Sequence, residues 1–288
     1  MKKVALLILL MFCFANSVWA EGRTTVLSRS VNNGAITGNI PEVDAISDDN
    51  MRKSINEVLK ARSYELAQAL QSDCVIGYTR LLDRASIFSI MLEAKAGEKT
   101  LYKAVNIDVT TGKECVIGDF FRDKDGLLKS LGGYEDIAFG ETGIYTRNDN
   151  FGSYETFVPY SKILRYVDIG EAGRFLTVHK VTGAAAGSKL HINEGELVAV
   201  KLDSNRSSGY LWELNASSKS SGLLEIGTSY IMPANQENKS VGSKGIDIIV
   251  LGAAEPGRYP VKLDYKRQWE KYPLSTVEFE LMVETKTN

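Results

Sequence analysis

GRYPVKLDYKRQWEKYPLSTVEFELMV, residues 257–283, decides the fold of the second half of this 288-residue chain. Apolar side chains alternate with polar ones near both of its ends, at Tyr259, Val261, Leu263, Tyr265, Val277, Phe279, Leu281 and Val283. A period of two is typical of strands that bury one face. The same alternation occurs at 198–202 and 246–250, and no helical period of useful length interrupts residues 171–288. This half therefore predicts an all-β, immunoglobulin-like sandwich of about seven strands.

Residues 21–170 mix helical and strand patterns instead. Apolar residues recur at helical spacing from 48 to 71, and Asp48 with its neighbours offers a cap. Strand alternation follows around 88–92 and 105–109, a second helical stretch at 123–131, and one more strand and turn at 155–164. The sequence thus predicts two domains, an α+β domain of uncertain role at 21–170 and the sandwich at 171–288.

The first twenty residues have the pattern of a secretory signal peptide. Lys2 and Lys3 precede an apolar run, and Val18-Trp19-Ala20 offers small residues for cleavage before Glu21. Removing residues 1–20 takes away two lysines and no acid, so the net charge changes from −2 to −4. We expect an exported protein, in the periplasm or the medium, with no membrane span after cleavage. No basic block is present that would bind nucleic acid.

Two cysteines remain after cleavage, Cys74 and Cys115. An exported chain with two cysteines can form one disulfide. The alternative is that both are buried thiols, which behave as small apolar residues. The sequence leaves both possibilities open.

The inventory of reactive residues argues against an enzyme. The two histidines, His179 and His191, show no metal-ligand spacing between them or with the cysteines. Gly242-Ser243-Lys244-Gly245 resembles a phosphate loop, but it precedes a predicted strand where such a loop requires a helix. We therefore expect neither a catalytic site nor a metal nor a cofactor.

Three loops of the second half are candidates for a binding surface. They are Asn205-Arg206-Ser207-Ser208-Gly209, Gly242-Ser243-Lys244-Gly245 and Lys266-Arg267-Gln268-Trp269-Glu270. Each interval between them holds two predicted strand traverses, so all three should emerge at the same end of the sandwich. Loops gathered at one end of a rigid β scaffold commonly form a recognition surface.

The aromatic residues beside these loops have different predicted roles. We expect Tyr210 and Trp212 to point to opposite faces of a strand, with at least one in the core, so that the strand holds the short first loop still. Trp269 is flanked by Arg267, Gln268 and Glu270. This composition predicts an exposed tryptophan of the kind found at interface hot spots.

The three loops, in this order, resemble those of the chagasin-type inhibitors of papain-like cysteine proteases. That family has Asn-Pro-Thr-Thr-Gly followed by Tyr-x-Trp, then Gly-x-x-Gly, then Arg-Pro-Trp-Glu. The counterparts here are 205–212, 242–245 and 267–270, and the likeness extends over about 180–285. Arg206 and Gln268 replace the two prolines, and Ser207 and Ser208 replace the two threonines. The first loop should therefore be more flexible and bind more weakly. The alternative is that Arg206 makes a contact of its own with an acidic group on a particular target.

The resemblance implies inhibition by occlusion, without a cofactor. The first loop would enter the cleft of a papain-like cysteine protease, from the organism or from a host, and the other two loops would flank it. The alternative is a cell-envelope sensing or binding module without inhibitory activity. The first half more loosely resembles an exported domain of unknown function found in some anti-sigma factors and cell-wall deacetylases, on "LYKAVNIDVTTGKECVIGDFF" and "FVPYSKIL".

Overall fold

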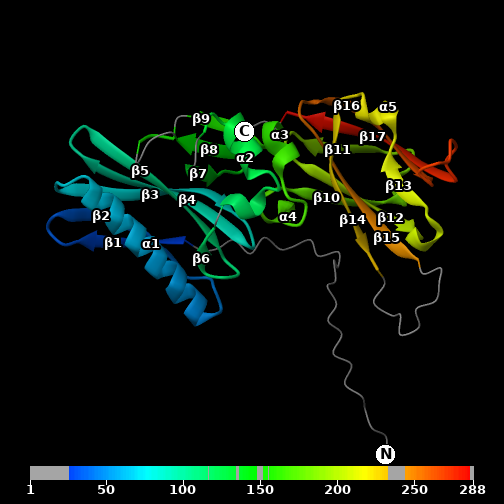
Figure 1. Cartoon of the computed structure of the whole chain (residues 1–288). Coiled ribbons are helices and arrows are strands. Elements are labelled where there is room, and N and C mark those ends of the chain that lie inside the picture. Colours follow the sequence, from blue (N-terminus) through cyan, green and yellow to red (C-terminus); the bar gives the residue numbers. More distant parts are fainter. Residues whose placement is uncertain are drawn as a thin grey trace, which may run out of the picture.

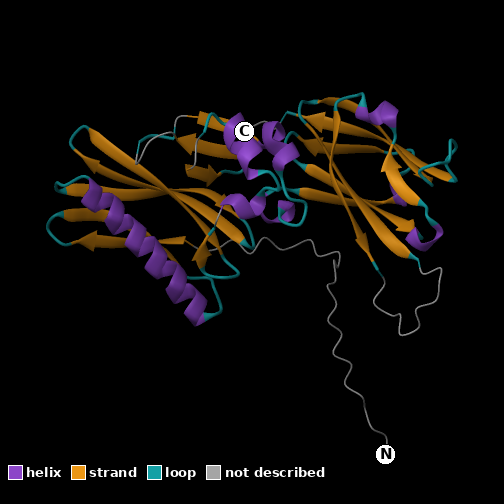
Figure 2. Ribbon diagram, viewed as in Figure 1, coloured by secondary structure: helices purple, strands orange, loops and turns teal. Residues whose placement is uncertain are grey.

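The computed structural model describes residues 26–115, 117–133, 136–147, 152–154, 156–232 and 244–285. The chain is mostly β-strand with few helices (Figures 1 and 2). The predicted signal peptide, together with Gly242 and Ser243 of the second loop, lies outside the described residues. Among the helices that are described, none has the length and apolar content needed to cross a membrane.

The first half is built on a six-stranded sheet with the strands in sequence order. Its strands are β1 (Val26–Asn32), β2 (Ile36–Val43), β3 (Cys74–Asp83), β4 (Ile87–Ala96), β5 (Lys99–Asp108) and β6 (Lys113–Glu114). Helix α1 (Asp49–Ala69) covers one face and buries Ile55, Leu59 and Leu66 against it (Figure 1). Asp48 caps the helix by accepting hydrogen bonds from the backbone of Asn50 and Met51, a contact worth about 1 kcal/mol. The helix predicted at 48–71 is confirmed.

A second, smaller unit follows the six-stranded sheet. Its strands β7 (Asp136–Phe139), β8 (Gly143–Arg147) and β9 (Thr156–Pro159) form a three-stranded sheet. Short helices accompany it: η1 (Ile117–Phe120), α2 (Lys124–Ser130), α3 (Tyr160–Ile163), η2 (Leu164–Tyr166) and α4 (Ala172–Phe175). The ring of Phe175 lies 5.7, 5.1 and 5.5 Å from those of Phe120, Phe139 and Tyr160. Aromatic rings at these distances pack favourably, and they lie in the local core together with aliphatic side chains.

The second half is the expected β-sandwich, with four strands in each of its two sheets. One sheet has the order β10 (Val178–Thr182), β12 (Leu197–Ser204), β15 (Gly245–Ala253), β14 (Leu223–Ile231), and the other β11 (Lys189–Asn193), β17 (Ser275–Glu284), β16 (Gly257–Lys266), β13 (Leu211–Leu214). Short helices η3 (Gly183–Ala185), η4 (Arg206–Ser208) and α5 (Ala216–Lys219) lie in its connections. The alternating residues predicted from sequence face each other between the sheets, with Val200, Leu251, Val261 and Leu281 almost fully buried.

One of the three buried hydrophobic clusters among the described residues contains residues of both halves. Phe139 and Leu164 of the first half belong to the same buried cluster as Leu197 and Ile226 of the sandwich. Gly252 allows this approach, because a Cβ there would lie 2.9 Å from side-chain carbons of Leu164 and Leu197. Residue 170, where the sequence pattern changes, therefore lies within a packed segment and not within an open linker.

Cys74 and Cys115 are both free thiols. Cys74 begins β3 and is buried beneath α1, whereas Cys115 follows β6 and packs against the core around Phe120. In this structure the two cysteines lie in different hydrophobic clusters and are not bonded to each other. The alternative of two thiols in apolar surroundings describes both.

Candidate functional site

The strand pairing brings the three predicted loops to one end of the sandwich. Ser204, which precedes the first loop, pairs with Gly245 at the end of the second. Leu211, which follows the first loop, pairs with Lys266 at the start of the third. The first loop crosses from one sheet to the other, while the second and third each connect strands within one sheet. Among the described residues, the first loop therefore lies between Gly245, which ends the second loop, and Lys266, which begins the third.

The first loop forms one tight turn of 3₁₀ helix, η4. Ser208 turns back onto Asn205, whose carbonyl accepts hydrogen bonds from the Ser208 amide at 3.1 Å and from its Oγ at 2.6 Å. The amide of Asn205 donates to Oη of Tyr265 at 2.7 Å. Gly209 ends the turn with φ +80°, a left-handed conformation that favours glycine. The loop is short and internally bonded.

The third loop is fastened to the first through Arg267. Its Nε donates to the carbonyl of Ser208 at 3.0 Å, and its guanidinium lies 4.4 Å from the centre of the Tyr210 ring. Glu270 accepts a further hydrogen bond from Arg267. Trp269 is 76% exposed, with Cη2 lying 3.6 Å from where a Cβ of Gly209 would stand. The prediction that Trp269 is exposed is confirmed.

The aromatic residues behind the first loop form a stack. The rings of Tyr210 and Trp212 lie 5.3 and 5.0 Å from that of Tyr265, and both are partly buried. The prediction that Tyr210 and Trp212 point to opposite faces is wrong, because residues two apart along a strand share a face. Trp212 also donates from Nε1 to the carbonyl of Asp203 at 2.8 Å. This stack supports the first loop, because the amide of Asn205 bonds to Oη of Tyr265.

Arg206 and Gly245 reveal partners that sequence reasoning missed. The guanidinium of Arg206 bonds to Asp247 of β15 and lies over the ring of Tyr230. The same ring explains Gly245, where a Cβ would stand 2.2 Å from Oη of Tyr230. The sequence feature that could have pointed to Asp247 is its position as a single acid in the otherwise apolar strand Gly245–Ala253.

Further apolar side chains are exposed beside the predicted loops. Met232 follows β14, and Tyr272 and Leu274 follow Trp269 in the connection between β16 and β17. The register places the ends of all these strands beside Gly245 or Tyr265. The loop end thus carries more exposed apolar surface than the family motif alone indicates.

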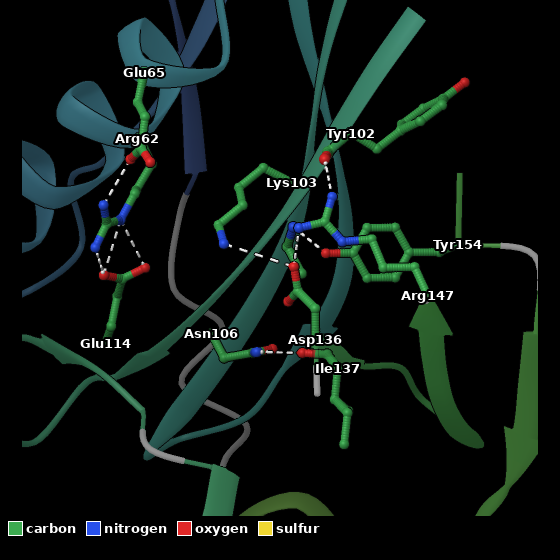
Figure 3. Close-up of polar contacts among 11 residues, drawn as sticks. Arg62, Glu65, Tyr102, Lys103, Asn106, Glu114, Asp136, Ile137, Arg147 and Tyr154 are labelled. Carbon is green, nitrogen blue, oxygen red and sulfur yellow. Dashed lines mark hydrogen bonds and ion pairs between the residues drawn. The ribbon is translucent and has the colours of Figure 1, made fainter. Parts of the chain in front are cut away.

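The first half holds a polar network that is the other candidate region (Figure 3). It borders a hollow of about 330 Å³ lined by residues that include Lys103, Glu114 and Asp136. These groups already bind one another or nearby arginines: Asp136 pairs with Lys103 and Arg147, and Glu114 pairs with Arg62. The ion pairs of Asp136 connect strands β5, β7 and β8. This structural role explains the polar network without a ligand.

The histidines and cysteines form no catalytic arrangement among the described residues. His179 pairs with Glu196 and His191 with Glu284, each at 2.7 Å. Burial raises the pKa of Cys115 to about 12, so this thiol remains protonated and is a poor nucleophile at neutral pH. No group of three or more potential metal ligands occurs in the part of the chain that the structure describes.

Comparison with known proteins agrees with this geometry. The model of the chagasin family of peptidase inhibitors matches residues 191–283, which run from β11 to β17. Chagasin of Trypanosoma cruzi is 31% identical over 94 residues, covering 32% of this chain and 83% of chagasin. The chain belongs to the chagasin family. The sandwich is therefore that of a chagasin-family inhibitor of cysteine proteases, and chagasin-family proteins are inhibitors, not enzymes.

Solved structures resemble each half separately. The cysteine protease inhibitor EhICP2 of Entamoeba histolytica is 24% identical, covers 38% of this chain and 97% of its own, and has a TM-score of 0.34. A duf3298-family protein of Bacteroides fragilis aligns with the N-terminal half at 12% identity. It covers 53% of this chain and 95% of its own, with a TM-score of 0.35. The family model itself covers residues 191–283 of the 288.

Proposed function

We propose that this protein is exported and inhibits papain-like cysteine proteases by placing the loop end of its sandwich over the active-site cleft. The first loop, 205–209, enters the cleft next to the catalytic cysteine. The second loop, 242–245, and the third, 267–270, contact the walls on either side. Access of substrate is blocked physically, and the inhibitor supplies no reactive group.

One observation carries the proposal. Trp269 exposes a large aromatic surface directly beside Gly209 on the central loop. Exposed aromatic residues near a well-packed centre are the usual hot spots of protein interfaces. Tyr272 and Leu274 extend the same exposed surface.

The order of the first loop supports tight binding. Its backbone is held by Asn205, Tyr265 and Arg267 before any partner arrives. A loop that is already ordered loses less conformational entropy on association. The serines at 207 and 208 are small enough for a narrow cleft, and both are satisfied by Asn205 within the loop.

The first half has a supporting role in this proposal. We infer that residues 21–170 and 171–288 are two domains whose interface is rigid, because one buried hydrophobic cluster contains residues of both. The first domain then fixes the sandwich on a larger body and leaves the loop end open to a protease.

The test is a titration of papain with residues 21–288, using a fluorogenic peptide substrate. We expect competitive inhibition with a one-to-one end point, because loop and substrate would occupy the same cleft. The variant Trp269→Ala serves as the matched control and should inhibit much less. Folded, uncleaved protein that inhibits neither papain nor a panel of related proteases would contradict the proposal and favour a binding module without inhibitory activity.

A further inference from the structure

Arg206 occupies the tip of the central loop, but its side chain turns back into the sandwich. Nε and Nη2 lie 2.8 and 2.6 Å from Oδ1 of Asp247 on β15. The guanidinium also stacks 4.5 Å from the centre of the Tyr230 ring on β14. Only 39% of the side chain is exposed. The positive charge therefore faces its own β-sheet.

Asp247 gives this contact its strength. Its side chain is 3% exposed, and Oδ2 accepts no hydrogen bond from any residue that the structure describes. A buried carboxylate is strongly disfavoured unless a cation compensates it. Asp247 is also a rigid anchor, because β15 pairs with β12 on one side and β14 on the other. The pair thus ties the loop tip to the middle of a sheet.

The first position of a 3₁₀ turn is one that proline can also occupy. Arg206 is the first residue of the 3₁₀ turn η4, where φ lies near −50 to −70°, and proline fixes φ near −65°. Within the described residues, the amide of Arg206 donates no backbone hydrogen bond that proline would remove. In the resembling family this position is proline. In this chain the position is Arg206, whose side chain forms an ion pair with Asp247.

We propose that Arg206 is a positioning residue, and that its pair with Asp247 holds the first loop in the conformation that proline would otherwise impose. This inference rests on the proposed function for its effect on inhibition. Arg206 then acts through the shape of residues 207–209, and an acidic contact on the protease is not required of it.

The experiment compares Asp247→Asn with Asp203→Asn in the protein of residues 21–288. Asp247 is buried beneath the loop and would not touch a bound protease, whereas Asp203 is an exposed acid on the paired strand β12, opposite Ile246. Two quantities are measured for each variant: amide hydrogen exchange at 207–209 in the free protein, and the inhibition constant for papain. Circular dichroism checks that both variants are folded.

We expect Asp247→Asn to accelerate exchange at 207–209 and to raise the inhibition constant about tenfold, since an unfastened loop must be ordered on binding. Asp203→Asn should change neither. Adding Arg206→Pro to Asp247→Asn should restore both to within about threefold of the original, because proline replaces the lost constraint. A role in overall stability alone would not produce this rescue.

Normal exchange and normal inhibition in folded Asp247→Asn would overturn the inference. Failure of rescue by Arg206→Pro would also overturn it. If Asp247→Asn does not fold, Arg206→Lys provides the same comparison, because lysine keeps the charge and loses the forked, stacked geometry. A native protein that inhibits neither papain nor the panel of related proteases would refute the proposed function, while the exchange data would still decide how the loop is held.

Discussion

The two ends of the sandwich are built from the same strands but meet very different surroundings. At the end facing the first half, Glu194 accepts a hydrogen bond from Ser161, and Glu255 pairs with Lys162. Aliphatic side chains and Phe175 close the space beneath them. At the loop end, Trp269 and Tyr272 are about three-quarters exposed.

The difference shows which residues the fold needs. Residues at the end of the sandwich that faces the first half, called the closed end below, are buried or paired within the chain. Their removal should therefore lower the stability of the fold. Those at the loop end are held in place by Arg267 and the Tyr265 stack but contribute little buried area themselves. Their removal should damage binding instead. The following predictions test this separation, from the largest expected free-energy change to the smallest.

Phe175→Ala should destabilise the closed end of the sandwich. Phe175 is fully buried among three other aromatic rings, so the substitution leaves a large cavity. We expect the free energy of unfolding to fall by about 3–5 kcal/mol, measured by urea denaturation. Phe157→Ala, at an exposed ring on β9, should lose less than about 1 kcal/mol. Equal losses in the two variants would mean that the shared core does not hold the halves together.

Trp269→Ala should weaken binding at the loop end without lowering the stability of the fold. We expect the inhibition constant for papain to rise by about 30–100-fold, equivalent to about 2–3 kcal/mol of binding. The free energy of unfolding should change by less than about 0.5 kcal/mol, because the side chain is exposed. Val75→Ala, at an exposed apolar position of the first half, is the control and should leave inhibition unchanged. A stability loss in Trp269→Ala as large as its binding loss would erase the distinction between the ends.

Gly209→Ala should strain the backbone of the central loop, and it tests whether the shape of that loop matters for inhibition. Gly209 has φ +80°, and an alanine there should lower the free energy of unfolding by about 1–2 kcal/mol. Gly187→Ala is a matched control, with φ +76° and open space around it. Both variants should lose similar stability in urea denaturation. Only Gly209→Ala should also weaken inhibition, and equal inhibition by the two would show that loop geometry is irrelevant.

The pH dependence of stability tests the first half through Cys115. Burial raises the pKa of its thiol to about 12 from 9.0, so the folded state keeps a proton that the unfolded state releases above pH 9. Stability contributed by this group is complete below pH 9 and is lost as pH rises toward 12. We expect a fall of about 1 kcal/mol between pH 9 and pH 10, which Cys115→Ala should lack. An identical slope in the variant would assign the effect to other groups.

Much of the fold was predictable because its signals are local. The cap at Asp48 and the helical period of α1 lie within one segment, and so does the alternation along β16 and β17. The three loops could be placed at one end by counting strands. The shared core between the halves was not predictable, because α3 and α4 have four residues each, too few to show a period.

The site was predictable in position but not in its supporting contacts. Arg206 and Asp247 are 41 residues apart, and nothing local indicates that they meet. The stack of Tyr210 and Trp212 on Tyr265 likewise depends on which strands become neighbours. The two cysteines illustrate the same limit, since composition allowed a bond that the fold does not form.

The most direct test of the central claim is a hydrogen-exchange footprint of residues 21–288 with and without bound papain. The account predicts slower exchange at 205–211 and 266–271 in the complex, with the six-stranded sheet and the Phe175 core unchanged. Protection confined to the first half, or an unaltered loop end while papain is inhibited, would contradict it.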